Sequence, residues 1–367
     1  MIRATAFVPL VVLAGCSATP QLRLAARIDG DFTSTSLPKR IEAIAGPPVT
    51  TFELRRARLD ARGDVPGGTS YRVMLDFASG RTEFKNAWLE QRLAERAALR
   101  AGYMTEPFGL ERRTSTRHVT FLERSLADTL MPGRNAGAML HGTLPEFDTT
   151  LAAGVFKDAT PQGLAVGTAG VHFTARATVA PWRNAAGDVV HVGTGYSHRR
   201  FEGNVVRIRA RPEAHSVSHL VDTGNIAAIQ ADLLGIEVAI VLGRWSVQAE
   251  AVHARHDLDG GGVADLTSGY VQGSVFLTGE RRAYRSATAT FGRVVPRAAR
   301  GAWEVAVRLS HLDLDDGRVQ GGRLTDATLG VNWYADRNMR IMWNLTAARL
   351  AGADTAVIAQ LRLQVDL

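Results

Sequence analysis

The chain has 367 residues, of which 43 are Lys or Arg and 36 are Asp or Glu, giving a formal net charge of +7. A chain of this length can hold two ordinary domains, but all-β barrels of the same length form a single unit. The excess of basic charge favours anionic partners. A nucleic acid is not expected, because the basic residues are spread through strand-like segments and no zinc-finger or ribonucleoprotein motif is present.

The amino-terminal segment predicts an export signal over residues 1–18. Met1-Ile2-Arg3 is positively charged, residues 4–13 are apolar, and residues 13–16 read Leu-Ala-Gly-Cys, which matches the lipobox at which bacterial lipoproteins are cleaved and acylated. We therefore predict lipidation of Cys16, the alternative being ordinary cleavage after Ala18. Because Cys16 is the only cysteine, the chain can form no intramolecular disulfide and no multi-cysteine metal site.

The rest of the chain predicts strands. After residue 18, no apolar run approaches the roughly 20 residues that a membrane-spanning helix needs. Segments of alternating apolar and polar residues recur from residue 22 onwards, separated by short Gly, Asp, Asn and Pro clusters. Residues 71–77 and 84–90 are one such pair, and residues 361–367 alternate up to the carboxyl end as a closing barrel strand would. About sixteen or seventeen segments of this kind predict one all-β domain over residues 19–367, a transmembrane antiparallel barrel of about 16 strands.

One long segment interrupts this pattern. Residues 102–138 are rich in arginine, begin just after one alternating strand and end just before another. This placement indicates a loop that folds into the lumen of the barrel. We expect it to narrow the lumen over about residues 106–133.

Arginines also alternate with apolar residues along two strand-like segments. Arg207, Arg209 and Arg211 occupy every second position, so an extended chain projects them to one face. Arg56 and Arg58 repeat the pattern, with Arg55 at an expected bulge. An arginine facing lipid at the bilayer midplane costs about 2 to 4 kcal/mol, so these faces should turn toward the lumen or the membrane interfaces. The alternative is the solvated face of a soluble β-sandwich.

Several segments, in order, carry a family resemblance: Leu54-Arg55-Arg56-Ala57-Arg58-Leu59, Gly187-Asp188-Val189-Val190-His191-Val192-Gly193, Ser268-Gly269-Tyr270, Leu277-Thr278-Gly279-Glu280 and Leu329-Gly330-Val331-Asn332-Trp333-Tyr334-Ala335. With the arginine-rich segment, they resemble the phosphate-selective porin O and P family from about residue 22 to the end. The resemblance implies a trimeric outer-membrane barrel of sixteen strands that conducts anions. It therefore implies small inorganic anions such as phosphate or chloride, outer-membrane lipid and a homotrimer as partners.

The resemblance also suggests which side chains face the anions. Arg23, Arg55 and Arg56 fall at positions of the family's basic ladder, and Arg124 and Arg285 retain its charge. Arg112 and Arg117 stand where characterised relatives have lysines, and Thr290 and Val295 replace lysines. A planar guanidinium is not equivalent to an ammonium in a tight oxyanion site, so a broader anion preference is expected. Together, the alternation and the resemblance predict an anion pathway lined by Arg23, Arg55, Arg56, Arg58, Arg112, Arg117, Arg124, Arg207, Arg209 and Arg285.

No catalytic motif accompanies these charges. The chain lacks a phosphate-binding Walker sequence, a His-Glu-x-x-His pair and a Gly-x-Ser-x-Gly elbow, so no catalysis, cofactor or metal is expected. The main hypothesis is an outer-membrane porin through which small anions diffuse passively. The alternative, motivated by Cys16, is an acylated β lipoprotein that binds anionic ligands at the cell envelope without forming a pore. An outer-membrane enzyme would need a catalytic serine or carboxylate site that the sequence does not reveal.

Overall fold

The computed structural model describes residues 21–162 and 170–367, so the predicted export signal and Cys16 lie outside the described residues. Sixteen antiparallel strands form a closed barrel, in agreement with the prediction. Strand β1 closes it by pairing with β19, from Arg27 opposite Asp366 to Ser36 opposite Val357. No helix in the described part of the chain is long and apolar enough to cross a membrane.

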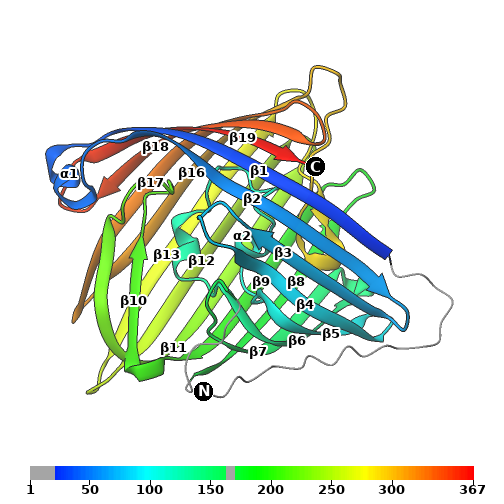
Figure 1. Cartoon of the computed structure of the whole chain (residues 1–367), viewed down its shortest axis with the longest axis horizontal. Helices are drawn as coiled ribbons and strands as arrows, with labels where there is room; N and C mark the ends of the chain where they lie inside the picture. The colour runs from blue at the N-terminus through cyan, green and yellow to red at the C-terminus, as the bar shows by residue number, and fades with distance from the viewer. Residues whose placement is uncertain (1–20, 163–169) are drawn as a thin grey trace, which may run out of the picture.

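The wall strands follow one another around the barrel in chain order (Figure 1). They are β1 (Gln21–Ser36), β2 (Thr50–Val65), β3 (Thr69–Asp76), β4 (Glu83–Ala94), β5 (Ala97–Thr105), β6 (Arg134–Leu144), β7 (Thr149–Lys157), β8 (Val171–Arg183), β9 (Val189–Arg200), β11 (Val221–Leu242), β12 (Trp245–Leu258), β13 (Val263–Phe276), β16 (Ala302–Asp316), β17 (Val319–Tyr334), β18 (Met339–Leu350) and β19 (Thr355–Asp366).

The remaining elements lie in the connections between wall strands. They are the α-helices α1 (Lys39–Ala45) and α2 (Leu110–Arg113), the 3-10 helices η1 (Leu126–Thr129), η2 (Pro145–Phe147), η3 (Glu202–Asn204) and η4 (Ser286–Thr288), and the short strands β10 (Val205–Ala210), β14 (Tyr284–Arg285) and β15 (Thr290–Phe291).

The alternation along each wall strand places apolar side chains outside and polar side chains inside. On β19, Leu361 and Leu363 are 44% and 46% exposed, whereas Arg362 is fully buried and Gln364 nearly so. A soluble sandwich would bury its apolar face, so the solvated-face alternative does not fit. An apolar exterior around a polar interior is the arrangement of a membrane barrel.

The two ends of the barrel differ. We call the end where β1 begins and β19 ends the terminus end, and the opposite end the loop end. Most connections at the terminus end are short, such as residues 66–68 and 243–244, but residues 277–301 form a long segment there. At the loop end, residues 106–133 and 201–220 are the long connections, and α2 of the first lies inside the barrel in Figure 1.

The segment of alternating arginines, expected as a wall strand, is instead an additional strand. β10 pairs with the first part of β11, from Val205 opposite Ala227 to Ala210 opposite Val221, whereas the later part of β11 pairs with β9. The connection after β10 enters the lumen, where Glu213 accepts a hydrogen bond of 2.5 Å from Ser310 on β16. Residues 201–220 therefore fill the loop end rather than build the wall.

Candidate functional site: an arginine-lined lumen

The constriction loop, residues 106–133 between β5 and β6, begins with a tight attachment to the wall. Phe108 is fully buried, and a Cβ at Gly235 on β11 would lie only 2.7 Å from its ring. The carboxylate of Glu250 on β12 accepts the backbone N–H groups of Leu110 and Glu111, each at 2.7 Å. Gly109 has φ +68°, and a Cβ there would meet that same carboxylate at 2.9 Å. This turn therefore requires glycine.

A second attachment is made by Glu123 at the far side of the loop. Arg55 donates two hydrogen bonds of 2.9 and 3.0 Å to its carboxylate, and Arg56 and Arg362 approach it at 3.3 and 2.7 Å. Burial raises the pKa of Glu123, but the guanidiniums of Arg55, Arg56 and Arg362 outweigh this effect and hold it well below its usual range. The loop is thus held by three wall arginines around one carboxylate.

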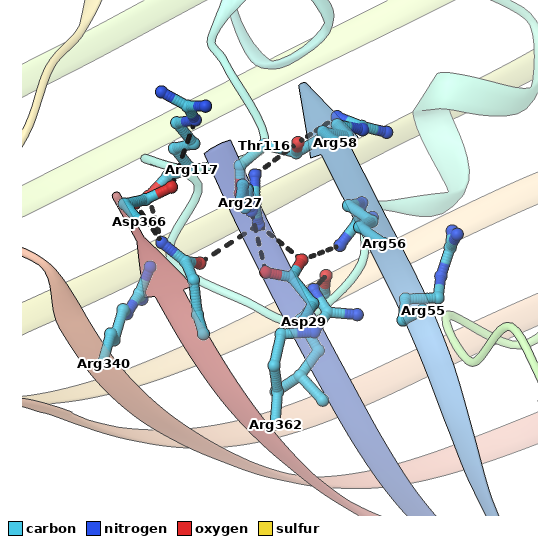
Figure 2. Close-up of polar contacts among 12 residues, drawn as sticks. Arg27, Asp29, Arg55, Arg56, Arg58, Thr116, Arg117, Arg340, Arg362 and Asp366 are labelled. Atoms are coloured by element: carbon cyan, nitrogen blue, oxygen red, sulfur yellow. Dashed lines mark hydrogen bonds and ion pairs between the residues drawn. The ribbon is translucent and has the colours of Figure 1, made fainter. Parts of the chain in front are cut away.

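Arginines of the neighbouring wall strands β1 and β2 also bind a shared carboxylate, as Figure 2 shows. Arg27 on β1 donates to both oxygens of Asp29, at 2.8 and 2.7 Å, and Arg56 on β2 reaches the same carboxylate at 2.9 Å. The loop residue Thr116 accepts hydrogen bonds from Arg27 and Arg58, at 2.9 and 3.2 Å. Much of the basic charge on this wall is therefore neutralised and serves to position the loop.

Other polar side chains bind the backbone of the loop directly. Arg340 on β18 donates to the carbonyl oxygens of Val119 and Thr120, at 2.8 and 2.9 Å, and Asn332 on β17 also donates to Thr120, at 3.0 Å. Within the loop, Arg124 donates to the carbonyl oxygens of Glu111, Arg112 and Thr114 at 3.0 to 3.1 Å. A buried carbonyl needs such a partner, so these bonds fix the course of the loop.

Two cavities lie on either side of the constriction loop. The loop-side cavity, about 320 Å³, is bordered by Arg55, Arg56, Arg211 and His215, and the terminus-side cavity, about 300 Å³, lies between the loop and residues 277–301. The residues that line both cavities are Arg58, Thr116, Arg124 and Arg134. We call these four residues the neck. A solute that passes from one cavity to the other therefore meets three guanidiniums.

The lining of the terminus-side cavity has one sign of charge. It contains ten arginines and neither Asp nor Glu among the described residues. The ten are Arg58, Arg72, Arg100, Arg112, Arg113, Arg117, Arg124, Arg134, Arg176 and Arg285. Seven of them pair with carboxylates that do not line this cavity, namely Asp60, Asp76, Glu90, Asp128, Glu237 and Asp366.

Three of the ten arginines have no ion pair within residues 21–162 and 170–367. Arg113 of α2 donates to the carbonyl oxygen of Thr105 at 3.1 Å, and Arg134 of β6 donates to that of Lys85 at 2.7 Å. Arg285 of β14 is exposed to the lumen. Burial, followed by the guanidiniums of Arg100 and Arg176, lowers the pKa of Arg113 to about 9, so it remains charged at neutral pH. These three unpaired arginines come from three different elements, α2, β6 and β14.

The segment at the terminus end, residues 277–301, brings Arg285 into the lumen. The hydroxyl of Tyr284 lies 2.8 Å from Nδ1 of His191 on β9, whose Nε2 lies 2.9 Å from the buried carboxylate of Glu237. Arg176 on β8 bonds that carboxylate and donates to the carbonyl oxygen of Ala289 at 3.0 Å. A polar network on the wall thus holds the β14–β15 hairpin inside the barrel.

The pKa of His118 in the constriction loop is lowered mainly by burial and further by nearby positive charge. Burial lowers its pKa to about 3, and the guanidiniums of Arg285, Arg293 and Arg117 act in the same direction. The imidazole is therefore neutral at physiological pH. The same field that disfavours a proton on His118 favours an anion in the adjacent cavity.

Seven of the ten arginines predicted for the anion pathway line one of the two cavities. Five of them line the terminus-side cavity, namely Arg58, Arg112, Arg117, Arg124 and Arg285. Arg55 and Arg56 line only the loop-side cavity. The ladder register shifts at Asp29, which faces Arg56 while the next residue faces Leu54, so Arg55 sits at a bulge. Arg55 holds Glu123, whereas Arg56 contacts Asp29 at 2.9 Å and Glu123 at 3.3 Å.

The other three predicted arginines line neither cavity. Arg23 lies near the terminus end and hydrogen-bonds Gln21 at 3.3 Å. Arg207 is half exposed on β10 and pairs with Asp222 at 2.5 Å, and Arg209 is exposed on the same strand. Arg207 and Arg209 lie outside both cavities because β10 pairs with the first part of β11 and does not belong to the barrel wall.

Sequence reasoning missed two of the three unpaired arginines, Arg113 and Arg134. Both lie within the arginine-rich segment, so its composition was the available signal. Their freedom from carboxylates depends on which acidic residues the folded wall presents to them, and this information is not local in the sequence.

The comparisons with known proteins agree with the barrel fold. The sequence model of the family described as phosphate-selective porin O and P matches residues 24–367. The chain belongs to this family. It is 27% identical over 329 residues to Porin O of Pseudomonas aeruginosa, covering 78% of this chain and 74% of that protein. It is therefore a porin of the bacterial outer membrane, and its family and fold point to a channel rather than an enzyme.

Solved structures show the same fold at low identity. A loop-deleted form of OmpT, an outer-membrane protein of Vibrio cholerae, superposes with a TM-score of 0.59 at 12% identity, covering 95% of this chain and 99% of that one. An anion-selective porin from Comamonas acidovorans gives a TM-score of 0.57 at 11% identity, covering 95% and 100%. At these identities the likeness concerns the fold alone.

Proposed function

We propose that this porin lets small anions such as chloride and phosphate diffuse passively through the arginine-lined passage formed by the two cavities and the neck. The observation that carries the proposal is the lining of the terminus-side cavity, which holds ten arginines and no carboxylate within the described residues. Fixed guanidiniums replace part of the hydration of an entering anion and raise its local concentration. Family membership and the anion selectivity of a porin of the same fold support the proposal.

A broad anion preference fits better than a site dedicated to phosphate. Arg112, which stands where relatives have a lysine, is held by Asp128 at 2.8 Å and donates to the carbonyl oxygen of that residue. Arg117, the other replaced position, pairs with Asp366 at 3.2 Å. Guanidiniums already engaged in this way attract anions through their field but have fewer N–H groups left to coordinate a phosphate.

The test is the reversal potential of the purified porin in a planar bilayer with a potassium chloride gradient. We expect anion selectivity, and we expect it to fall in Arg113→Gln, Arg134→Gln and Arg285→Gln because each removes a charge that no carboxylate balances. Arg281→Gln is the matched control, since Arg281 belongs to the same segment as Arg285 but pairs with Asp188 at 3.0 Å. Unchanged reversal potentials in all three variants would contradict the proposal.

We also propose that the porin assembles as a homotrimer, as the family resemblance implies. Chemical cross-linking of the protein in outer-membrane fragments, followed by mass determination, tests the assembly. A single cross-linked species of three chains is expected, and monomers alone would overturn it.

A further inference from the structure

The terminus-side cavity carries an apolar patch beside its arginines. Met74 on β3, Trp88 on β4, Met104 on β5 and Pro107 of the constriction loop all line this cavity; we call these four residues the apolar patch. The interior of a porin barrel is normally polar, so side chains of this kind inside the lumen require a reason.

Part of the reason is that the wall behind the patch must be filled. Phe156 on β7 is almost fully buried and covers Gly137 and Gly154, since a Cβ at either position would lie within 3 Å of its ring. Phe156 packs with Met139 and Met104, and Trp88 lies against this cluster. Phe156 and Met139 are not part of the cavity lining. They fill the wall, but they do not account for the apolar patch that lines the cavity.

Trp88 is the accessible member of the apolar patch. It is only partly buried, and the guanidinium of Arg100 lies 4.1 Å from its ring centroid. Arg100 is in turn fixed by Glu90, at 2.5 Å. An indole held in this way is rigid, and the part of it that Arg100 and the wall cluster leave uncovered offers an apolar surface at the cavity.

The cavity thus combines unpaired positive charge with an apolar surface. Arg113, Arg134 and Arg285 line the same space of about 300 Å³ as Trp88 and Met74, which is at the lower end of the volumes of small-molecule sites. We propose that this cavity is a binding subsite for organic monocarboxylates that carry a small aromatic or apolar group. The carboxylate lies among the unpaired arginines, whose planar forks suit it, and the apolar group lies against Trp88. This inference rests on the proposed anion conduction.

Such a subsite discriminates between anions by their apolar part. Benzoate and acetate present the same carboxylate, but only benzoate has a ring that can leave water at the apolar patch. Chloride and inorganic phosphate likewise gain nothing from the patch. We therefore expect benzoate to occupy the cavity about tenfold more readily than acetate, as burial of one side of a ring would give.

The experiment measures the block of the single-channel chloride current by added benzoate or acetate. In the unmodified porin, the half-blocking concentration should be about tenfold lower for benzoate than for acetate. Equal values would overturn the inference while leaving anion conduction intact. A channel that shows no anion selectivity in the chloride gradient would instead remove the proposed function on which the inference rests.

Variants locate the subsite. Trp88→Gln should raise the half-blocking concentration of benzoate about tenfold and leave that of acetate and the chloride reversal potential unchanged. Met74→Gln should act in the same direction and serves if Trp88→Gln does not fold, as judged by heat-modifiable gel mobility. Trp245→Gln, on the outer face of β12, is the control and should change neither value. Equal losses for both carboxylates in Trp88→Gln would assign Trp88 to wall shape alone and overturn the inference.

Discussion

At the scale of single residues, the lumen uses arginine for two different purposes. Arginines that face a carboxylate, such as Arg56 and Arg362, hold the constriction loop in place. Those without one, such as Arg113 and Arg285, leave their charge facing the cavity. The carboxylate of Glu123 is the main point at which arginines hold the loop, because three guanidiniums meet there.

We predict that Glu123→Gln loosens the constriction loop. Removing Glu123 takes away the carboxylate partner of Arg55 and one of the two carboxylates that Arg56 and Arg362 each contact. Breaking a buried charge cluster in this way costs about 3 kcal/mol or more. Hydrogen exchange of the backbone amides near residues 119–124, measured by mass spectrometry on detergent-solubilised porin, should become about a hundredfold faster. Glu146→Gln, which breaks the exposed Arg96–Glu146 pair at the terminus end, should leave the exchange near residues 119–124 unchanged. Equal exchange in Glu123→Gln and the unmodified porin would show that the wall carbonyl contacts alone hold the loop.

The same carboxylate predicts a pH dependence. Because the pKa of Glu123 is held well below its usual range in the folded loop, its contribution to stability is fully present above the ordinary value of about 4.3. It is lost as the pH falls below that value through the lower, folded pKa. The protection of the loop amides in the same experiment, taken relative to the intrinsic exchange rate at each pH, should therefore be constant between pH 8 and 5 and fall only in stronger acid.

The alternation of Arg56 and Arg58 with apolar residues could predict their inward face, because a strand places every second side chain on one side. It could not predict that Arg56 meets Asp29 and Glu123 while Arg134 meets no carboxylate in the described part of the chain. Those pairings join residues from strands and a loop that are distant in the sequence, and many registers are compatible with the same local pattern.

At the scale of elements, the wall strands could be predicted because each one alternates apolar and polar residues with a period of two. The segments inside the lumen could be predicted only in part. Residues 106–133 could be expected there from their arginines and their place between two strands. Residues 201–220 and 277–301 also contain several arginines, but their local sequence did not distinguish a segment inside the lumen from a wall strand or an outer connection. Their position depends on contacts such as Glu213 with Ser310 and Tyr284 with His191, which exist only once the barrel has closed.

Replacing residues 282–295 by a short Gly-Ser linker tests the role of the segment at the terminus end. We expect single-channel conductance to rise, because the β14–β15 hairpin leaves the lumen, and anion selectivity to fall, because Arg285 leaves with it. Both are measured in the planar bilayer. Shortening the exposed connection at residues 259–262 is the control and should change neither. A rise in conductance without loss of selectivity would mean that Arg113 and the neck are sufficient to select anions.

At the scale of the whole molecule, the barrel places apolar side chains against the membrane and positive charge around a narrow passage, so its selectivity should come mainly from a field rather than from coordination. Fixed charges act over about 10 Å at 0.1 M salt but only about 3 Å at 1 M. We therefore predict that the ratio of chloride to potassium permeability, measured from reversal potentials at a constant tenfold gradient, falls as the mean salt concentration rises from 0.1 to 1 M. The Arg134→Gln porin should show a smaller fall, because less unbalanced charge remains to be screened. A ratio that does not depend on salt would instead indicate that anions pass in direct contact with the guanidiniums of the neck.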